Sequence, residues 1–89
     1  MANLTVDRNL AFVRMSGKPV EINEIEFEIL WAMINKPGKF WTAEDLESTF
    51  PPFSQIGKKS IRVAMESLNS KMSSFIRYDH SRGFKFRRA

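Results

Sequence analysis

Hydrophobic positions change their spacing along the chain, and these changes predict a strand-rich start, a helical middle and a terminal hairpin. Residues 4–22 contain three short β-like stretches separated by turn-forming residues. The stretches are 4–6, 10–14 and 20–22, and the separators are 7–9 and 16–19. We therefore expect a small antiparallel sheet at the start of the chain, which needs a helix to pack against.

The first two helices are indicated by their N-terminal capping signals. Asn23 followed three residues later by Glu26 resembles a capping box, so a first helix should cover residues 24–35. Apolar residues recur at helical spacing through that segment, and a Pro-Gly pair follows it. Thr42 offers a second N-cap, which predicts a short helix over residues 43–49.

The rest of the chain divides into a loop, a third helix and a hairpin, after a short aromatic strand at 39–41. Two adjacent prolines argue against a regular helix in residues 50–57, so we expect a loop there. A third helix over residues 58–73 follows from apolar residues spaced by four, three and four, namely Ile61, Met65, Leu68 and Met72. Residues 75–87 alternate around a turn at 79–83, which predicts a terminal β-hairpin.

Composition excludes several classes of protein. The 89 residues include no cysteine and one histidine, which excludes a disulfide, a thiolate nucleophile and a Cys/His zinc site. No catalytic carboxylate pair or Ser-His-Asp set appears, and residues 57–60 lack the order of a phosphate-binding loop, so we expect neither an enzyme nor a cofactor. The longest apolar run, 29–34, is too short to span a membrane, and no signal pattern precedes it. The sequence predicts a soluble, cytoplasmic protein with no membrane partner.

Charge is unevenly distributed along the chain. Lys and Arg number 14 against 10 Asp and Glu, which gives a formal net charge of +4. Residues 21–28 hold four carboxylates and no base. The last thirteen positions hold five cations, which are Arg77, Arg82, Lys85, Arg87 and Arg88. Such a basic end permits nucleic acid, an anionic membrane or an acidic protein as partner.

Four stretches resemble, in the correct order, the OmpR/PhoB-type effector domain of bacterial response regulators. Residues 22–30 (INEIEFEIL) look like the family string LTxxEFxLL, and residues 35–46 (NKPGKFWTAEDL) resemble NPGrvfsReeL. Residues 59–68 (KSIRVAMESL) are similar to RtVDVhIxxL, and residues 76–86 have the length of IxTVRGxGYxF. The resemblance covers nearly the whole chain. It implies one α+β domain over residues 1–89, a winged helix-turn-helix with an N-terminal antiparallel sheet, three helices and a C-terminal hairpin wing.

The resemblance weakens where members of the family contact DNA. The family usually carries Arg or Lys on the third-helix face and an Arg in the wing, whereas the residues here are Glu66, Ser67, Asn69, Ser70 and, in the wing, His80. A carboxylate at Glu66 would be repelled by phosphate, so the family contacts do not transfer unchanged. The sequence also has no receiver domain, and we expect no phosphorylation-driven dimerisation from it.

Candidate DNA contacts come from the third helix and the wing. Lys58, Lys59 and Arg62 cluster at the start of the helix, where bases and phosphates are met, and Ser67 and Asn69 can read bases. The wing candidates are Arg77, His80, Arg82, Lys85 and Arg87. The alternatives are a solvated polar helix face and a solubilising charged tail. For His80, an exposed turn histidine is a simpler reading than a ligand or pH switch.

Two apolar sets complete the candidates. Five aromatic residues could stack on bases, but their spacing places most of the five in the core between helix and sheet; they are Phe27, Trp31, Phe40, Trp41 and Phe84. The loop residues Phe50, Phe53 and Ile56 form a candidate protein-contact site, because the resemblance implies contact with RNA polymerase there. Packing of this loop on its own domain is the alternative.

The leading hypothesis is a sequence-specific regulator of transcription that binds double-stranded DNA. The third helix would enter the major groove and the wing would contact the backbone or minor groove. A single module buries only about 600–1,000 Å² on DNA, so we expect a homodimer or a partner protein beside it. The alternative is a winged-helix adaptor or anti-regulator whose Glu66 face contacts RNA polymerase or another regulator.

Overall fold

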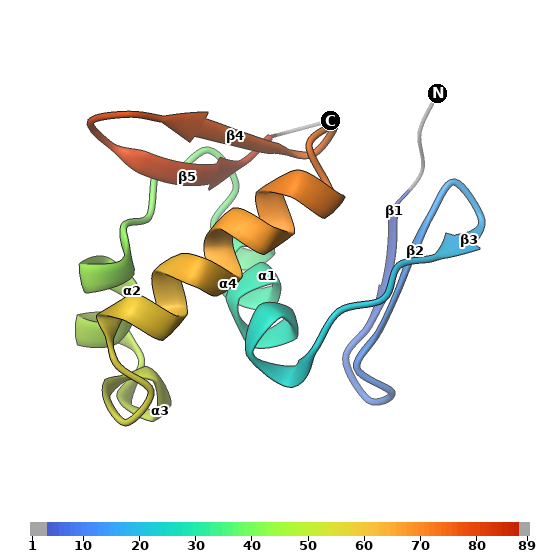
Figure 1. Cartoon of the computed structure of the whole chain (residues 1–89). Coiled ribbons are helices and arrows are strands. Elements are labelled where there is room, and N and C mark those ends of the chain that lie inside the picture. The colour runs from blue at the N-terminus through green and yellow to red at the C-terminus, as the bar shows by residue number, and fades with distance from the viewer. Residues whose placement is uncertain (1–3, 88–89) are drawn as a thin grey trace.

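The computed structural model describes residues 4–87, in which a small sheet, a group of helices and a second hairpin follow one another (Figure 1). In chain order the elements are β1 (Leu4–Asp7), β2 (Phe12–Met15), β3 (Lys18–Pro19), α1 (Glu24–Asn35), α2 (Ala43–Thr49), α3 (Pro51–Ser54), α4 (Lys58–Lys71), β4 (Ile76–Asp79) and β5 (Gly83–Phe86). None of these helices has the length and apolarity needed to cross a membrane.

The N-terminal sheet is antiparallel, in the order β1-β2-β3, and lies to one side of the helices (Figure 1). Its third strand differs from the expectation of residues 20–22. Ser16 and Gly17 both adopt positive φ, 54° and 79°, as a two-residue hairpin turn of the I′ type requires, so pairing resumes at once at Lys18. The strand ends at Pro19, and Val20 adds one further hydrogen bond from its N–H to the carbonyl of Val13.

The turn after β1 fastens this sheet to α1. The Arg8 guanidinium lies 2.9 Å from a Glu28 carboxylate oxygen and 5.3 Å from the centre of the Trp31 ring. Both members of the ion pair are well exposed, so it contributes little to stability. Val13, which is 1% exposed, supplies the buried apolar contact of the sheet with the core.

Helices α1 and α2 begin and end where the sequence predicted. In each, a capping box joins the N-cap side chain to the backbone N–H three residues later, and the carboxylate of that later residue accepts from the N-cap N–H. The pairs are Asn23 with Glu26 and Thr42 with Asp45. Capping boxes therefore fix both helix starts locally.

The helices differ from the sequence prediction in two places. Residues 50–57 were expected to form a loop, but Pro51–Ser54 forms the short helix α3. The prolines occupy the first two positions of α3. The N–H groups at the start of a helix have no hydrogen-bond partner within the helix, so proline loses nothing there, and its fixed φ is favourable. Helix α4 ends at Lys71 rather than at residue 73, because Met72 leaves helical geometry at φ −129° and ψ 42°.

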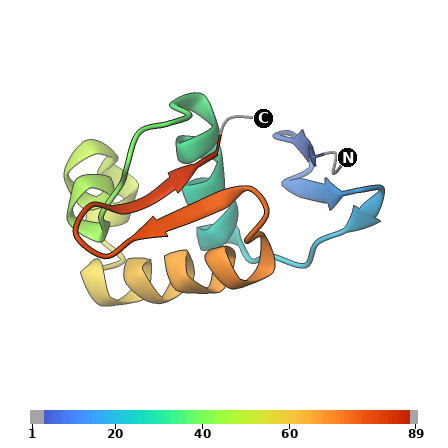
Figure 2. The same cartoon turned by 90° about the horizontal axis from the view of Figure 1, so that it is seen from above.

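The core lies where α1, α2 and α4 meet beneath the β4–β5 hairpin (Figure 2). Trp41, Leu46, Ile61 and Leu68 have no exposed surface. Phe27, Trp41 and Phe84 are buried, as predicted for the aromatic set, whereas Trp31 and Phe40 remain half-buried. The expected strand at 39–41 is reduced to one bridge, in which Trp41 and Phe84 exchange backbone hydrogen bonds of 2.6 and 2.8 Å. This bridge holds β5 against the start of α2.

Candidate nucleic-acid interface

Helix α4 buries one side and exposes the other along its length. The buried residues are Ile61, Ala64, Met65 and Leu68. The residues on the opposite side, spaced by four, three and four, form what we call the outer stripe, namely Lys59, Val63, Glu66 and Ser70. Exposed Arg62 lies beside the stripe. The outer stripe thus presents a cation, an apolar group, an acceptor and a hydroxyl to a partner.

The N-terminus of α4 carries positive charge without compensation. Its N-cap is Gly57, whose φ of 93° suits glycine, and no side chain caps the first turn. That turn contains no acid, and Lys58 and Lys59 are both exposed. Cations at the positive end of a helix dipole are unfavourable, and anions are stabilised there. The start of α4 is therefore suited to an anionic partner.

Ser67 and Asn69, the two residues of α4 predicted to read bases, are less exposed to solvent than the sequence suggested. Ser67 is half-buried, and its side chain faces the carboxylate of Glu26 on α1, whose pKa it helps to lower. Asn69 is also half-buried, at the margin of the exposed side. Of the third-helix candidates, only Lys58, Lys59 and Arg62 are exposed.

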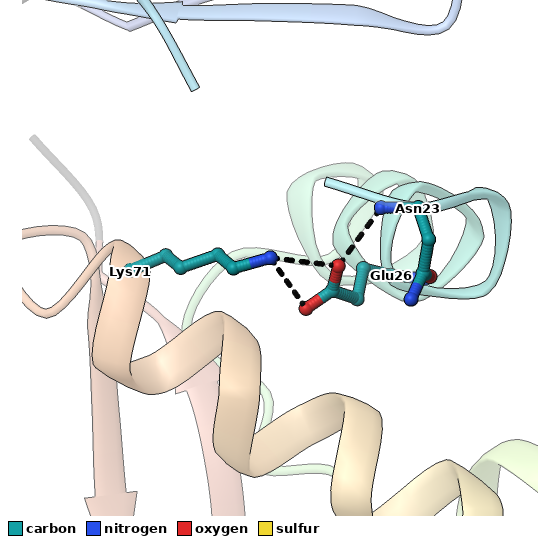
Figure 3. A network of polar contacts seen from close by, with 3 residues as sticks. All are labelled: Asn23, Glu26 and Lys71. Atoms are coloured by element: carbon teal, nitrogen blue, oxygen red, sulfur yellow. Dashed lines mark hydrogen bonds and ion pairs between the residues drawn. The ribbon is translucent and has the colours of Figure 1, made fainter. Parts of the chain in front are cut away.

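A buried carboxylate sets the position of α4 against α1 (Figure 3). Glu26 is 1% exposed, and the Lys71 ammonium lies 3.0 and 3.2 Å from its two oxygens. Burial by itself would raise the pKa of Glu26, but hydrogen bonds from Ser67, the N–H of Asn23 and Lys71 outweigh it and lower the pKa. Glu26 is therefore ionised at neutral pH and joins the two helices.

Replacing Lys71 by methionine should lower the free energy of unfolding by about 1–3 kcal/mol at pH 7, because Glu26 loses its only charged partner among residues 4–87. The pKa of Glu26 is lower in the folded chain than in the unfolded chain, where it is about 4.3. The ion pair therefore stabilises the fold at pH values above about 4.3, and this contribution is lost as pH falls through the folded pKa. Urea unfolding at pH 7 and pH 3 measures both effects, and the loss should shrink in acid.

The matched control is Lys18→Met, at an exposed lysine that makes no ion pair with residues 4–87. It should leave stability almost unchanged at both values of pH. Equal losses for Lys71→Met at neutral and acid pH would show that packing, rather than the ion pair, accounts for the change.

Two wing cations face each other across the hairpin. Arg77 on β4 is the residue directly opposite Lys85 on β5 in the strand register, so both side chains project from the same face of the hairpin. Like charges directly opposite on a sheet are destabilising. No acidic side chain among residues 4–87 forms an ion pair with either one. Arg87 is exposed just after β5, and Arg88 lies outside the described residues.

The remaining wing cation, Arg82, contacts a carboxylate and an aromatic ring. The Arg82 guanidinium lies 4.0 Å from Asp79 and 5.2 Å from the centre of the Phe40 ring. The Lys85 ammonium lies over the same ring at 4.9 Å. Hydrogen bonds from the N–H and hydroxyl of Ser81, followed by the N–H and charge of Arg82, lower the pKa of Asp79. The turn is therefore braced, and Arg82 offers less free charge than Arg77.

A hollow of about 330 Å³, the α4–wing hollow, separates the outer stripe from the wing. Arg62 and Glu66 line it from α4, and Tyr78, His80 and Ser81 line it from the hairpin. Two exposed apolar side chains of this region were absent from the sequence candidates, Val63 at 59% and Tyr78 at 51% exposure. Val63 could have been found as the one apolar residue on the polar side of α4. Tyr78 could not, because its strand pattern predicts an inward side chain.

The predicted protein-contact loop lies on another face. Phe53 is 4% exposed and packs into the core, whereas Phe50 and Ile56 are half-buried. These three side chains line a groove of about 750 Å³, the α1 groove, together with Arg8, Glu24, Ile25, Glu28, Trp31, Ala32, Asn35 and Lys36. Phe53 thus supports the loop, and Phe50 and Ile56 are the members of the set that a partner could reach.

Comparison with known proteins identifies the fold. The sequence matches no protein-family model and no curated protein. The C-terminal domain of the nisin resistance regulator NsrR, a lantibiotic response regulator, is similar, with a TM-score of 0.77 and 21% identity over 97% of this chain and 93% of that one. The Klebsiella pneumoniae RstA DNA-binding domain, in complex with the RstA box, gives 0.73 and 21% over 94% and 90%.

A third structure extends this likeness. The DNA-binding domain of the response regulator AdeR, in complex with an intercistronic region, gives a TM-score of 0.75 at 16% identity, over 98% of this chain and 95% of that one. The α+β fold predicted from the sequence is therefore confirmed. It is the winged-helix fold of OmpR/PhoB-type response-regulator effector domains.

Proposed function

We propose that this chain is a regulator of transcription that binds double-stranded DNA, with α4 in the major groove and the wing on the adjacent backbone or minor groove. The observation that carries the proposal is the uncompensated positive charge at two places, the start of α4 and the β4–β5 hairpin. Lys58 and Lys59 lie at an uncapped helix start, and Arg77 lies opposite Lys85. Each arrangement is unfavourable alone, and a row of phosphates would stabilise both.

The fold supports this proposal independently of charge. Two of the similar domains, those of RstA and AdeR, were solved in complexes with DNA. The size of a single module leads us to expect that the chain acts as a homodimer or beside another protein. The outer stripe of α4 offers side chains for the base contacts that distinguish sequence-specific from purely electrostatic binding.

The test is fluorescence anisotropy of a labelled random duplex, titrated at several salt concentrations. Binding should weaken steeply with salt, because every neutralised phosphate releases a counterion. Lys59→Ala should weaken binding to all duplexes alike and reduce the salt slope by about 1. The control is Lys36→Ala, which removes a lysine that lines the α1 groove. Absence of binding at tens of micromolar in low salt would contradict the proposal.

The α1 groove favours a second candidate function, a winged-helix adaptor that binds RNA polymerase or another regulator. Its rim offers Trp31, Phe50 and Ile56 as half-buried apolar side chains. The test is binding of purified RNA polymerase to the chain and to two variants. Loss of binding with Ile56→Asp and unchanged binding with Arg77→Glu would support this candidate. Equal binding of polymerase to both variants would exclude the groove as its site.

A further inference from the structure

Glu66 is the single acid on the outer stripe of α4, and it is free. It is exposed in the third turn of the helix, and no residue among 4–87 forms an ion pair or hydrogen bond with its carboxylate. Arg62, one turn earlier, shares the α4–wing hollow with it but does not pair with it. The carboxylate is thus available to accept hydrogen bonds from a partner.

Charge limits where this carboxylate can lie on DNA. Phosphates line the edges of a groove and would repel it, whereas base edges form the floor. Cations lie beside Glu66 toward the start of α4, namely Lys59 on the outer stripe and Arg62 in the α4–wing hollow. Those cations are placed to meet the phosphates. The middle of the outer stripe, with Val63 and Glu66, then lies over the bases.

The floor of the major groove offers only two kinds of donor, the N4 amine of cytosine and the N6 amine of adenine. Adenine also presents the N7 acceptor beside its amine. A carboxylate can only accept, so it is repelled by that N7 and has no donor to satisfy it. Cytosine is therefore the base that suits Glu66. A glutamine, with one acceptor and one donor group, suits adenine instead.

We propose that Glu66 is a specificity-determining residue that accepts a hydrogen bond from the N4 amine of a cytosine in the major groove. The chain would then select duplexes with a C·G pair at that position. This inference rests on the proposed DNA binding and adds to it the base that α4 reads. It also gives a physical reason for an acid on a helix that otherwise presents cations, apolar groups and hydroxyls.

The experiment is selection of binding sites from a random duplex library by the wild-type chain and by Glu66→Gln. The substitution keeps the shape of the side chain on an exposed helix position, so the fold should be unaffected. The wild type should enrich a motif with cytosine at one position. Glu66→Gln should enrich adenine at that position and leave the rest of the motif unchanged, with about a tenfold change in the preference between the two bases.

The control is Glu21→Gln, which makes the same change at an exposed carboxylate before α1. It should select the wild-type motif. An identical motif for wild type and Glu66→Gln would overturn the inference, as would salt-dependent binding without any enriched motif. In both cases the proposed DNA binding would stand. Loss of all duplex binding by the wild type would instead overturn the proposed function, and this inference with it.

Discussion

Reversing the charge of the two facing wing residues, Arg77→Glu with Lys85→Glu, should lower the affinity for a random duplex by at least about 100-fold at moderate salt. The double variant removes two phosphate contacts and places two carboxylates against the backbone. These positions are preferred to Arg82, because the Arg82 guanidinium lies 4.0 Å from the Asp79 carboxylate whereas neither Arg77 nor Lys85 has an acidic partner among residues 4–87. A glutamate there would also lie next to Asp79 and disturb the turn. Anisotropy titration of the labelled duplex measures the loss.

The control for this prediction is Lys18→Glu with Lys36→Glu, which alters net charge equally at exposed positions outside the wing and α4. It should lower the affinity much less, because neither lysine belongs to the proposed DNA-contact surface. Circular dichroism of both variants checks that the fold is kept. Equal losses in the two variants would mean that net charge, rather than the wing, governs binding.

Gly83→Ala should reduce the free energy of unfolding by more than about 3 kcal/mol, out of a total of about 5–15 kcal/mol for a native domain. Gly83 starts β5 at a φ of +106°, which L side chains rarely adopt. An added Cβ would overlap the carbonyl oxygen of Trp41 and lie 2.7 Å from its carbonyl carbon. Because the wing would have to leave Trp41, thermal unfolding should shift by more than about 12 °C.

Gly38→Ala separates the two causes of this loss. Gly38 has a similar positive φ of +86°, but a Cβ there would meet open space. Its substitution should therefore cost only the conformational strain, about 1–2 kcal/mol. If both alanine variants lost the same stability, the contact between Gly83 and Trp41 would not be what fixes the wing.

Local signals in the sequence were sufficient for the helices but not for every boundary. The capping boxes at Asn23 and Thr42 involve residues three apart, so they fix α1 and α2 without tertiary information. The helix α3 was missed because prolines oppose a helix interior yet suit a helix start. The strand β3 shifted because positive φ at Ser16 and Gly17 makes the turn shorter than its composition suggests.

The candidate site was predictable in its charge but not in its contacts. The basic end and the lysines of α4 follow directly from their positions along the chain. The contact of Arg82 and Lys85 with Phe40 depends on a segment more than 40 residues earlier, which only the bridge at Trp41 brings to β5. The inward position of Ser67 depends on a buried carboxylate, which an amphipathic pattern assigns to the surface.

Mapping the duplex onto the chain by NMR tests the proposed interface most directly. A ¹⁵N-labelled chain would be titrated with an unlabelled random duplex, and the shifts of its backbone amides followed. We expect the shifts to concentrate in residues 58–70 of α4 and 77–85 of the wing, while the amide signals of residues around the α1 groove stay in place. Shifts concentrated around Trp31 and Ile56, or no shifts in low salt, would contradict the proposed interface.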